Sequence, residues 1–196
     1  QPTELVVRKQ LSALDVHALA FIARSPLLLL GTSNPAGTCD VSPKGDAPGF
    51  VRALDDKTLV IPDRVGNRRV DSLTNIVENP HVGLIFLIPG MDETLRVNGG
   101  ARIVRDEGLL EEMAVQGRRP NVAIVVDVQE CFLHCPKAFL RSHFWDPSRY
   151  MDRSEMPSLI RMLLDQTMPA DRCEEDHERL VQEEEQRRAA TPPVLY

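Results

Sequence analysis

The residues best suited to chemistry lie in the stretch TLVIPDRVGNRRVDSLTNIVENP, from Thr58 to Pro80. A short apolar strand runs through a Pro-Asp turn into a loop with three arginines, and a helix follows. Planar guanidinium groups match phosphate oxygens, and the free N–H groups at a helix N-terminus favour an anion. The pattern predicts a phosphate-binding site formed by Arg64, Asn67, Arg68 and Arg69. The alternative interpretation is a solvated basic loop that only connects strand and helix.

The helix of this stretch has an amphipathic pattern. Asn67 is its expected N-cap, and Asn79 before Pro80 is its expected end. Helical spacing of apolar residues predicts one buried face. The residues of that face are Val70, Leu73, Ile76 and Val77.

A second informative stretch is HCPKAFLRSHFWDP, residues 134–147. If Pro136 opens a helical turn, Lys137 and Arg141 share one face. A flat aromatic ligand needs a packing surface and a few convergent polar groups, which this stretch offers through its tryptophan and basic residues. The alternative is a loop whose Trp145 plugs the end of a barrel.

Short apolar or alternating segments joined by tight turns make up most of the chain before residue 134. They predict a mainly β protein, and their order favours a closed antiparallel barrel over a βαβ sheet. Gly99 and Gly100, adjacent inside one long strand, predict a bulge or the close approach of another backbone. We expect a barrel domain over residues 1–150 and a helical C-terminal extension over residues 151–196, with a highly charged helix at 174–190.

Composition narrows the class of protein. A formal charge of −6 over 196 residues argues against nucleic-acid binding. Cys131, Cys135 and His134 form at most a partial metal site because no second ligand pair accompanies them, so no metal is expected. Reduced thiols, with no signal peptide and no apolar run of membrane-spanning length, lead us to expect a soluble cytoplasmic protein.

Four segments, taken in order, resemble one known family. They are SPKGD (42–46), IPDRVGNRRVDSLTNIVENPHVGLIFLIPG (61–90), LRVNGGARI (95–103) and HCPKAFLRSHFWDP (134–147). Together they resemble the pyridoxamine 5'-phosphate oxidase-like flavoproteins of the FMN-binding split-barrel fold, and more narrowly a bacterial branch of FMN-binding members.

The resemblance implies a six-stranded antiparallel split barrel with flanking helices, a homodimer, and two FMN sites at the interface between the subunits. It implies that Ser42 and Lys44 flank the flavin ring. It also implies two further groups of cofactor-binding residues, one near the phosphate and one covering the site from the other subunit. The first group is Arg64, Asn67, Arg68, Arg69 and Ser72; the second is Lys137, Arg141, Ser142 and Trp145.

The resulting hypothesis is an FMN-dependent oxidoreductase that moves a hydride or electrons between a small-molecule donor and an acceptor. Lys44, Lys137 and Arg141 are the candidates to stabilise negative charge on the reduced flavin. Hydride transfer requires no general acid or base, and His143 is only a weak candidate for one, so no catalytic residue is assigned. One alternative is a flavin- or haem-binding protein without turnover, for storage, sensing or partner docking. Another is a haem-degrading or deazaflavin-dependent enzyme in the same barrel.

Overall fold

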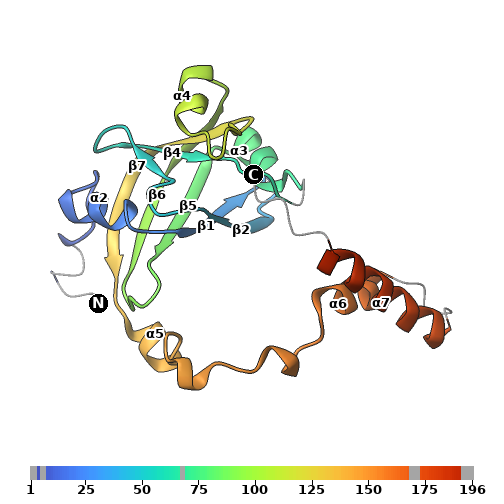
Figure 1. Ribbon diagram of the computed structural model, residues 1–196. Coiled ribbons are helices and arrows are strands. Elements are labelled where there is room, and N and C mark those ends of the chain that lie inside the picture. The colour runs from blue at the N-terminus through green and yellow to red at the C-terminus, as the bar shows by residue number, and fades with distance from the viewer. Residues whose placement is uncertain (1–3, 5–7, 67–68, 168–172, 191–196) are drawn as a thin grey trace. The chain divides into compact units, whose positions relative to one another are not determined.

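The computed structural model describes residues 4, 8–66, 69–167 and 173–190. Its contacts divide the chain into two compact units, Gln1–Trp145 and Asp146–Leu195. The first unit carries the sheet, and the second carries the helices α6 and α7 (Figure 1). The expected boundary at residue 150 stays a prediction.

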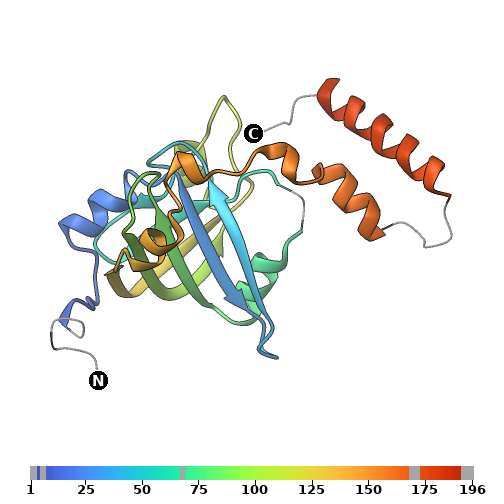
Figure 2. The ribbon, with the colours of Figure 1, turned by 90° about the horizontal axis from the view of Figure 1, so that it is seen from below.

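An antiparallel sheet dominates the first unit. In the described part of the chain it has seven strands in the order β2-β1-β5-β6-β7-β4-β3. Hairpins join neighbours such as β1 and β2, and Figure 2 shows these two crossing in front of the rest of the curled sheet. The strands are β1 (Leu27–Ser33), β2 (Cys39–Gly45), β3 (Arg52–Ala53), β4 (Thr58–Pro62), β5 (His81–Leu87), β6 (Thr94–Val104) and β7 (Ala123–His134).

This sheet confirms the predicted mainly β, split-barrel fold and corrects two details. The seventh strand is β3, a two-residue segment that pairs with β4. The expectation of a closed barrel is wrong for the described residues, because no backbone pairing among them joins the edge strand β2 to β3 or β4. Pro43 lies within β2, opposite Leu29 of β1.

The core lies inside the curl of the sheet. Alternate residues of each strand point inward, as Leu28 and Leu30 do on β1 and Leu84 and Phe86 do on β5, all with no exposed surface. Helix α2 (Val16–Ile22) adds Ala18, Phe21 and Ile22 to the same cluster. A smaller cluster lies under α4 (Glu107–Glu112) and contains Val60, Leu110, Met113, Ala123 and Val125.

The two glycines inside β6 mark a bulge, as predicted. The register between β6 and β7 shifts between Asn98 and Gly99. A Cβ atom on Gly99 would lie 2.2 Å from the backbone oxygen of Asp127, whereas one on Gly100 would have its nearest neighbour at 3.7 Å. Gly99 is therefore required for the close approach of two backbones, and Gly100 is not.

Helix α3 (Asp71–Glu78) differs from the prediction in its start and in its buried face. Val70, not Asn67, is the N-cap; Asn67 itself lies outside the described residues. Ile76 is buried as expected, but Val70 and Val77 are 56% and 74% exposed. Two polar residues, Ser72 and Asn75, are buried with Ile76 instead. Hydrophobic spacing missed Ser72 and Asn75 because hydrogen bonds hold them, whereas Ile76 and Leu73 contact the core as apolar residues.

Two further parts complete the fold. Helix α5 (Lys137–Ser142) follows β7 directly, with Pro136 at its N-cap. The second unit pairs α6 (Leu159–Thr167) with α7 (Glu174–Ala190), burying Ile160 and Val181. Among the described residues, no helix is both long and apolar enough to span a membrane.

We predict that Gly99→Ala destabilises the fold by about 1–3 kcal/mol, because the new methyl group must push the β6 and β7 backbones apart. Denaturant unfolding measures this change. Gly100→Ala is the matched control in the same strand and is expected to lose little stability. Equal losses for the two variants would contradict the proposed close approach.

A second prediction concerns Cys131, which is 1% exposed in the core. Burial, and secondarily the charge of Asp15, raises the pKa of this thiol from 9.0 to about 11. Above the lower value the unfolded chain releases a proton that the folded chain retains, so the free energy of unfolding falls as pH rises between these values. The slope is at most about 1.4 kcal/mol per pH unit. Cys131→Ala should reduce this slope, and Cys39→Ala, at an exposed thiol, should not; an unchanged slope in the first variant would refute the assignment.

Candidate functional site

One face of β2 presents polar side chains at every second residue. Asp40, Ser42 and Lys44 are half-buried, and the residues between them are exposed. The alternation follows from the period of two in a strand. Two of the predicted flavin-ring residues, Ser42 and Lys44, therefore share one face, and Asp40 shares it with them.

Two ion pairs join the end of β2 to the loop after β4. The Lys44 Nζ lies 2.9 Å from Asp63 Oδ1, and the Arg64 Nε lies 2.7 Å from Asp46 Oδ2. The second pair is well shielded, since the Asp46 side chain is 3% exposed and the Arg64 side chain is 16% exposed. Arg64 Nη1 also donates to the carbonyl oxygen of Met113, 2.7 Å away. These contacts hold Arg64 in the protein framework.

Helix α3 is fastened to the β1–β2 hairpin by buried polar contacts. Ser72 Oγ donates to Ser42 Oγ at 3.1 Å, so the predicted phosphate residue and the predicted ring residue touch. Asn75 Nδ2 donates to Thr32 Oγ1 at 3.0 Å and to Asp40 Oδ2 at 2.8 Å. Because an unsatisfied buried amide is costly, these bonds fix the helix against the strand. The N-terminus of α3 is thereby held beside the polar face of β2.

The arginine loop is described only in part. Arg69 is exposed, and its Nε lies 2.8 Å from Asp71 Oδ2. The hydrogen bond to Asp71 raises the pKa of Arg69 above its ordinary value. Asn67 and Arg68, both predicted phosphate ligands, lie outside the described residues.

The predicted covering segment lies elsewhere in the same chain. Trp145 Nε1 donates to the carbonyl oxygen of Met91, 2.8 Å away, in the turn between β5 and β6. The Trp145 ring stacks on Phe139 at 6.0 Å between centroids. Lys137 and Arg141 are exposed on α5, and the Ser142 hydroxyl donates to the carbonyl oxygen of Phe139. Within one chain the tryptophan thus packs against a turn, and its place over a flavin stays a prediction.

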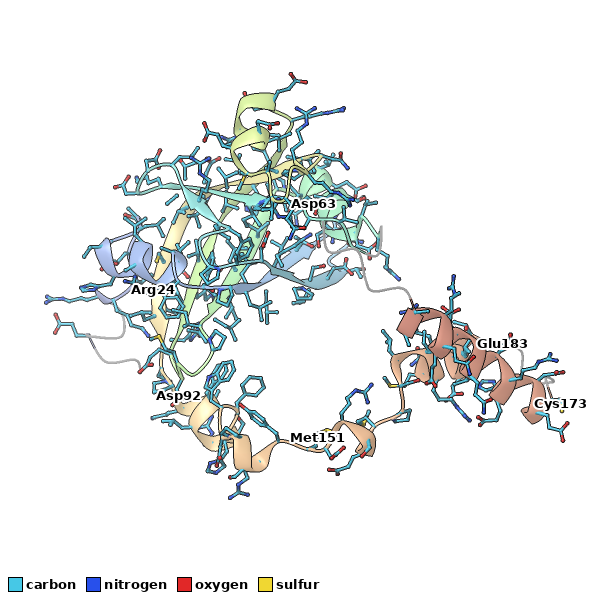
Figure 3. All side chains as sticks on the ribbon, in the orientation of Figure 1. Arg24, Asp63, Asp92, Met151, Cys173 and Glu183 are labelled. Carbon is cyan, nitrogen blue, oxygen red and sulfur yellow. The ribbon has the colours of Figure 1, made fainter. Side chains whose placement is uncertain are left out.

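The length of β7 separates the two predicted halves of the site. Ala123, at its start, pairs with Pro62 just before the arginine loop, and His134, at its end, leads into α5. At about 3.3 Å per residue the strand spans roughly 36 Å. Figure 3 shows Asp63 near α3 at one end of the first unit and Asp92 near α5 at the other. One chain gathers Ser42, Lys44, Arg64, Arg69 and Ser72 around the loop after β4 and the start of α3. It carries Lys137, Arg141, Ser142 and Trp145 on the segment that follows β7.

Acidic residues that were not predicted from the sequence accompany the cations of this site. The described residues of this end include three cations, Lys44, Arg64 and Arg69, and four carboxylates, Asp40, Asp46, Asp63 and Asp71. The net charge of these described residues is therefore not positive and does not by itself attract an anion. Hydroxyl and backbone N–H donors must contribute to anion binding here. The sequence does contain a signal for these acidic residues. In the segments SPKGD and PDR, each cation lies within two residues of an aspartate.

The structure offers no metal cluster in this region. Cys131 is buried in the core and Cys135 is exposed. No group of three or more histidine, cysteine or acidic residues in the described ranges is arranged to hold a metal ion.

Comparisons with known proteins agree with this architecture. The family model described as Pyridoxamine 5'-phosphate oxidase matches residues 14–135, which is more than half of the chain. The crystal structure of HupZ from Group A Streptococcus has a TM-score of 0.50 and 21% sequence identity, covering 61% of this chain and 93% of the HupZ chain. An FMN-binding protein from Syntrophomonas wolfei has a TM-score of 0.48 and 10% identity, covering 67% of this chain and 91% of that chain. No match was found among curated proteins.

The likeness to HupZ supports the fold, and the family model supports the lineage. With the split-barrel sheet and the resemblance of four ordered segments, these findings establish that the chain belongs to the pyridoxamine 5'-phosphate oxidase family.

Proposed function

We propose that the protein binds FMN between two copies of the chain and transfers a hydride or electrons between a small-molecule donor and an acceptor. The observation that carries the proposal is the 3.1 Å hydrogen bond between Ser72 and Ser42. It joins the N-terminus of α3, suited to a phosphate, to the polar face of β2, suited to the edge of a flavin ring. Family membership makes FMN the ligand to test first.

The phosphate end would rely on α3 and the loop before it. The helix N-terminus supplies free N–H groups and a positive dipole end. Ser72 is buried, and its O–H would have to turn from Ser42 to the phosphate in order to bind it. Arg69 and the predicted ligands Asn67 and Arg68 would add charge-assisted hydrogen bonds. Arg64, held by Asp46 and Met113, would position this loop rather than bind the phosphate with its whole guanidinium fork.

The ring would lie along β2. When bound, FMN would supply the hydride or electron chemistry, and the protein would supply orientation and local charge. The ammonium of Lys44 would favour negative charge on the pyrimidine side of the ring. Asp63, 2.9 Å from Lys44, would hold that ammonium in place and partly offset its charge.

An exposed apolar face of the sheet supports a second copy of the chain. The outer face of β1 and β5 is apolar: Leu27 lies opposite Leu87, and Leu29 opposite Ile85. Leu27 and Ile85 are 37% and 36% exposed. We propose that a partner subunit covers this face, since burying apolar surface is the main force in stable association.

A two-fold arrangement would also complete the site. An isologous dimer makes both sites equivalent, and in it the α5 end of one copy can meet the α3 end of the other. Lys137, Arg141, Ser142 and Trp145 would then cover the partner's flavin and exclude water from it. The four free cysteines support a reducing compartment, and we place the protein in the cytoplasm.

The rival function is flavin or haem binding without turnover. A visible spectrum of the purified protein separates ligands, because haem gives a Soret band and FMN gives the flavin bands. Stopped-flow mixing of the FMN-loaded protein with nicotinamide donors then separates an enzyme from a binding protein. Absence of flavin, with no rise in melting temperature on adding FMN, would overturn the proposed function.

We predict that Arg69→Ala weakens FMN binding roughly tenfold or more, because it removes a charge-assisted hydrogen bond to the phosphate. Riboflavin, which lacks the phosphate, should bind wild type and variant equally. Fluorescence titration of both flavins measures the two affinities. Arg24→Ala, at an exposed arginine that donates to Ala20 of α2, is the control and should change neither. Equal losses for FMN and riboflavin would contradict a phosphate role for Arg69.

We further predict that Ile85→Asp converts the dimer to a monomer and lowers FMN affinity at the same time, because it places a charge in the apolar face. Light scattering after gel filtration gives the mass, and flavin fluorescence gives the affinity. Val16→Asp is the control, since Val16 is 71% exposed on α2. A monomeric wild type that binds FMN tightly would disprove the two-copy site.

A further inference from the structure

A second group of basic side chains gathers on the outer face of β6 and β7, near the ends that lead into α5. Its position depends on the N-terminal segment. Leu11 and Cys131 exchange two backbone hydrogen bonds, of 2.9 and 2.8 Å, and Lys9 and Gln10 also contact the last part of β7. Lys9 Nζ donates to the carbonyl oxygen of Leu133 at 2.6 Å. The segment thereby brings a cation to β7 that would otherwise be remote in sequence.

Two cations lie close to the ring of Phe132. Lys9 Nζ is 5.2 Å from the ring centroid, and the Arg96 guanidinium carbon is 5.5 Å from it. Arg96 and Phe132 are cross-strand partners in the β6–β7 register. His134 lies next along the same face, with its ring centroid 5.0 Å from that of Phe132. The aromatic ring explains how the two cations are held so near each other, since cation–π attraction operates at this range.

No carboxylate neutralises these cations within the described residues. Glu130 lies on this face, where its Oε1 accepts from Asn98 Nδ2 at 2.9 Å and its Oε2 accepts from Gln10. In the described ranges, Glu130 forms no ion pair with Lys9 or Arg96. Glu93 forms none with them either, although it directly precedes Thr94, the cross-strand partner of His134. In a chain with a formal charge of −6, such a cluster is unusual.

The imidazole of His134 responds to both cations. Burial, then the charges of Arg96 and Lys9, lower the pKa of His134 below its ordinary value. A positive potential therefore converges at this imidazole from two different elements. An anion bound there would remove that potential and favour the protonated ring.

We propose that Lys9, Arg96 and His134 form a binding site for the phosphate group of a small ligand, beside the Phe132 ring. Arg96 uses its Nε to donate to Asn98 Oδ1 at 3.2 Å, which leaves its four terminal N–H groups for a ligand. Lys9 keeps two N–H groups beyond its bond to Leu133, and His134 adds a ring N–H. Donors from three side chains match the three terminal oxygens of a phosphate better than the two oxygens of a carboxylate. The proposal does not rest on FMN binding, because none of its donors belongs to the residues proposed to hold FMN.

The test is a phosphate titration of the full chain, followed by the NMR signal of the His134 imidazole. The signal is assigned by its loss in His134→Gln, since the chain has five histidines. Chloride is exchanged for inorganic phosphate at constant ionic strength, because salt alone screens the two cations. We expect phosphate to raise the pKa of His134 with saturation. Arg96→Gln and Lys9→Gln should each raise that pKa without phosphate and weaken the apparent phosphate affinity roughly tenfold.

The controls separate this site from a general charge effect and from misfolding. Arg102→Gln, on the same strand but in an exposed ion pair with Asp127, should respond to phosphate like the wild type. Arg96→Lys retains the charge and should retain part of the response. Equal phosphate responses of wild type and Arg96→Gln would overturn the proposal. An equal response to acetate would indicate a carboxylate ligand and overturn the choice of phosphate. A response to phosphate that does not saturate would also overturn the proposal.

Discussion

The two ion pairs between β2 and the loop after β4 are the contacts on which the proposed site depends most. Backbone hydrogen bonds leave β2 at one edge of the sheet and β3 and β4 at the other. Lys44 with Asp63 and Arg64 with Asp46 connect these edges by side chains. They fix the start of the arginine loop against the polar face of β2, as the contacts of Ser72 and Asn75 fix the helix that follows the loop. Since the second pair is shielded from water, loss of one partner would leave a buried charge, which is far more costly than loss of an exposed pair.

The same contacts determine what kind of site this end of the sheet can form. Cations that are already paired with carboxylates do not provide a strong attractive field, but they do provide fixed positions. Recognition of a phosphate then depends on oriented donors, the N–H groups at the start of α3, more than on net charge. The buried contacts of Asn75 with Thr32 and Asp40 keep those donors aligned with β2. An arrangement of this kind favours selectivity for ligand shape.

Much of the fold followed from the sequence, because its strands are apolar or alternating runs bounded by proline and glycine. The bulge at Gly99 was also predictable, since paired glycines inside a strand have few other purposes. The rotation of α3 was not predictable, because Ser72 and Asn75 are buried by hydrogen bonds that hydrophobic periodicity does not detect. The pairing of Arg64 with Asp46 joins positions 18 apart, and no local spacing rule indicates it. The distance between α5 and the arginine loop emerged only from the length of β7.

Pro43 has a consequence for how this protein behaves at high concentration. It lies in β2, an edge strand of the sheet, opposite Leu29 of the neighbouring strand β1. An open edge usually offers a row of N–H and C=O groups to any other extended chain. Proline has no N–H group, so it interrupts that row in the middle of the strand. Strand β4 pairs with β7 only as far as Asp127. Beyond that point, the bridge from Leu11 to Cys131 covers the exposed edge of β7. At β2 and at the end of β7, the sheet therefore offers less backbone for the addition of a further strand, which is the first step toward fibrous aggregates.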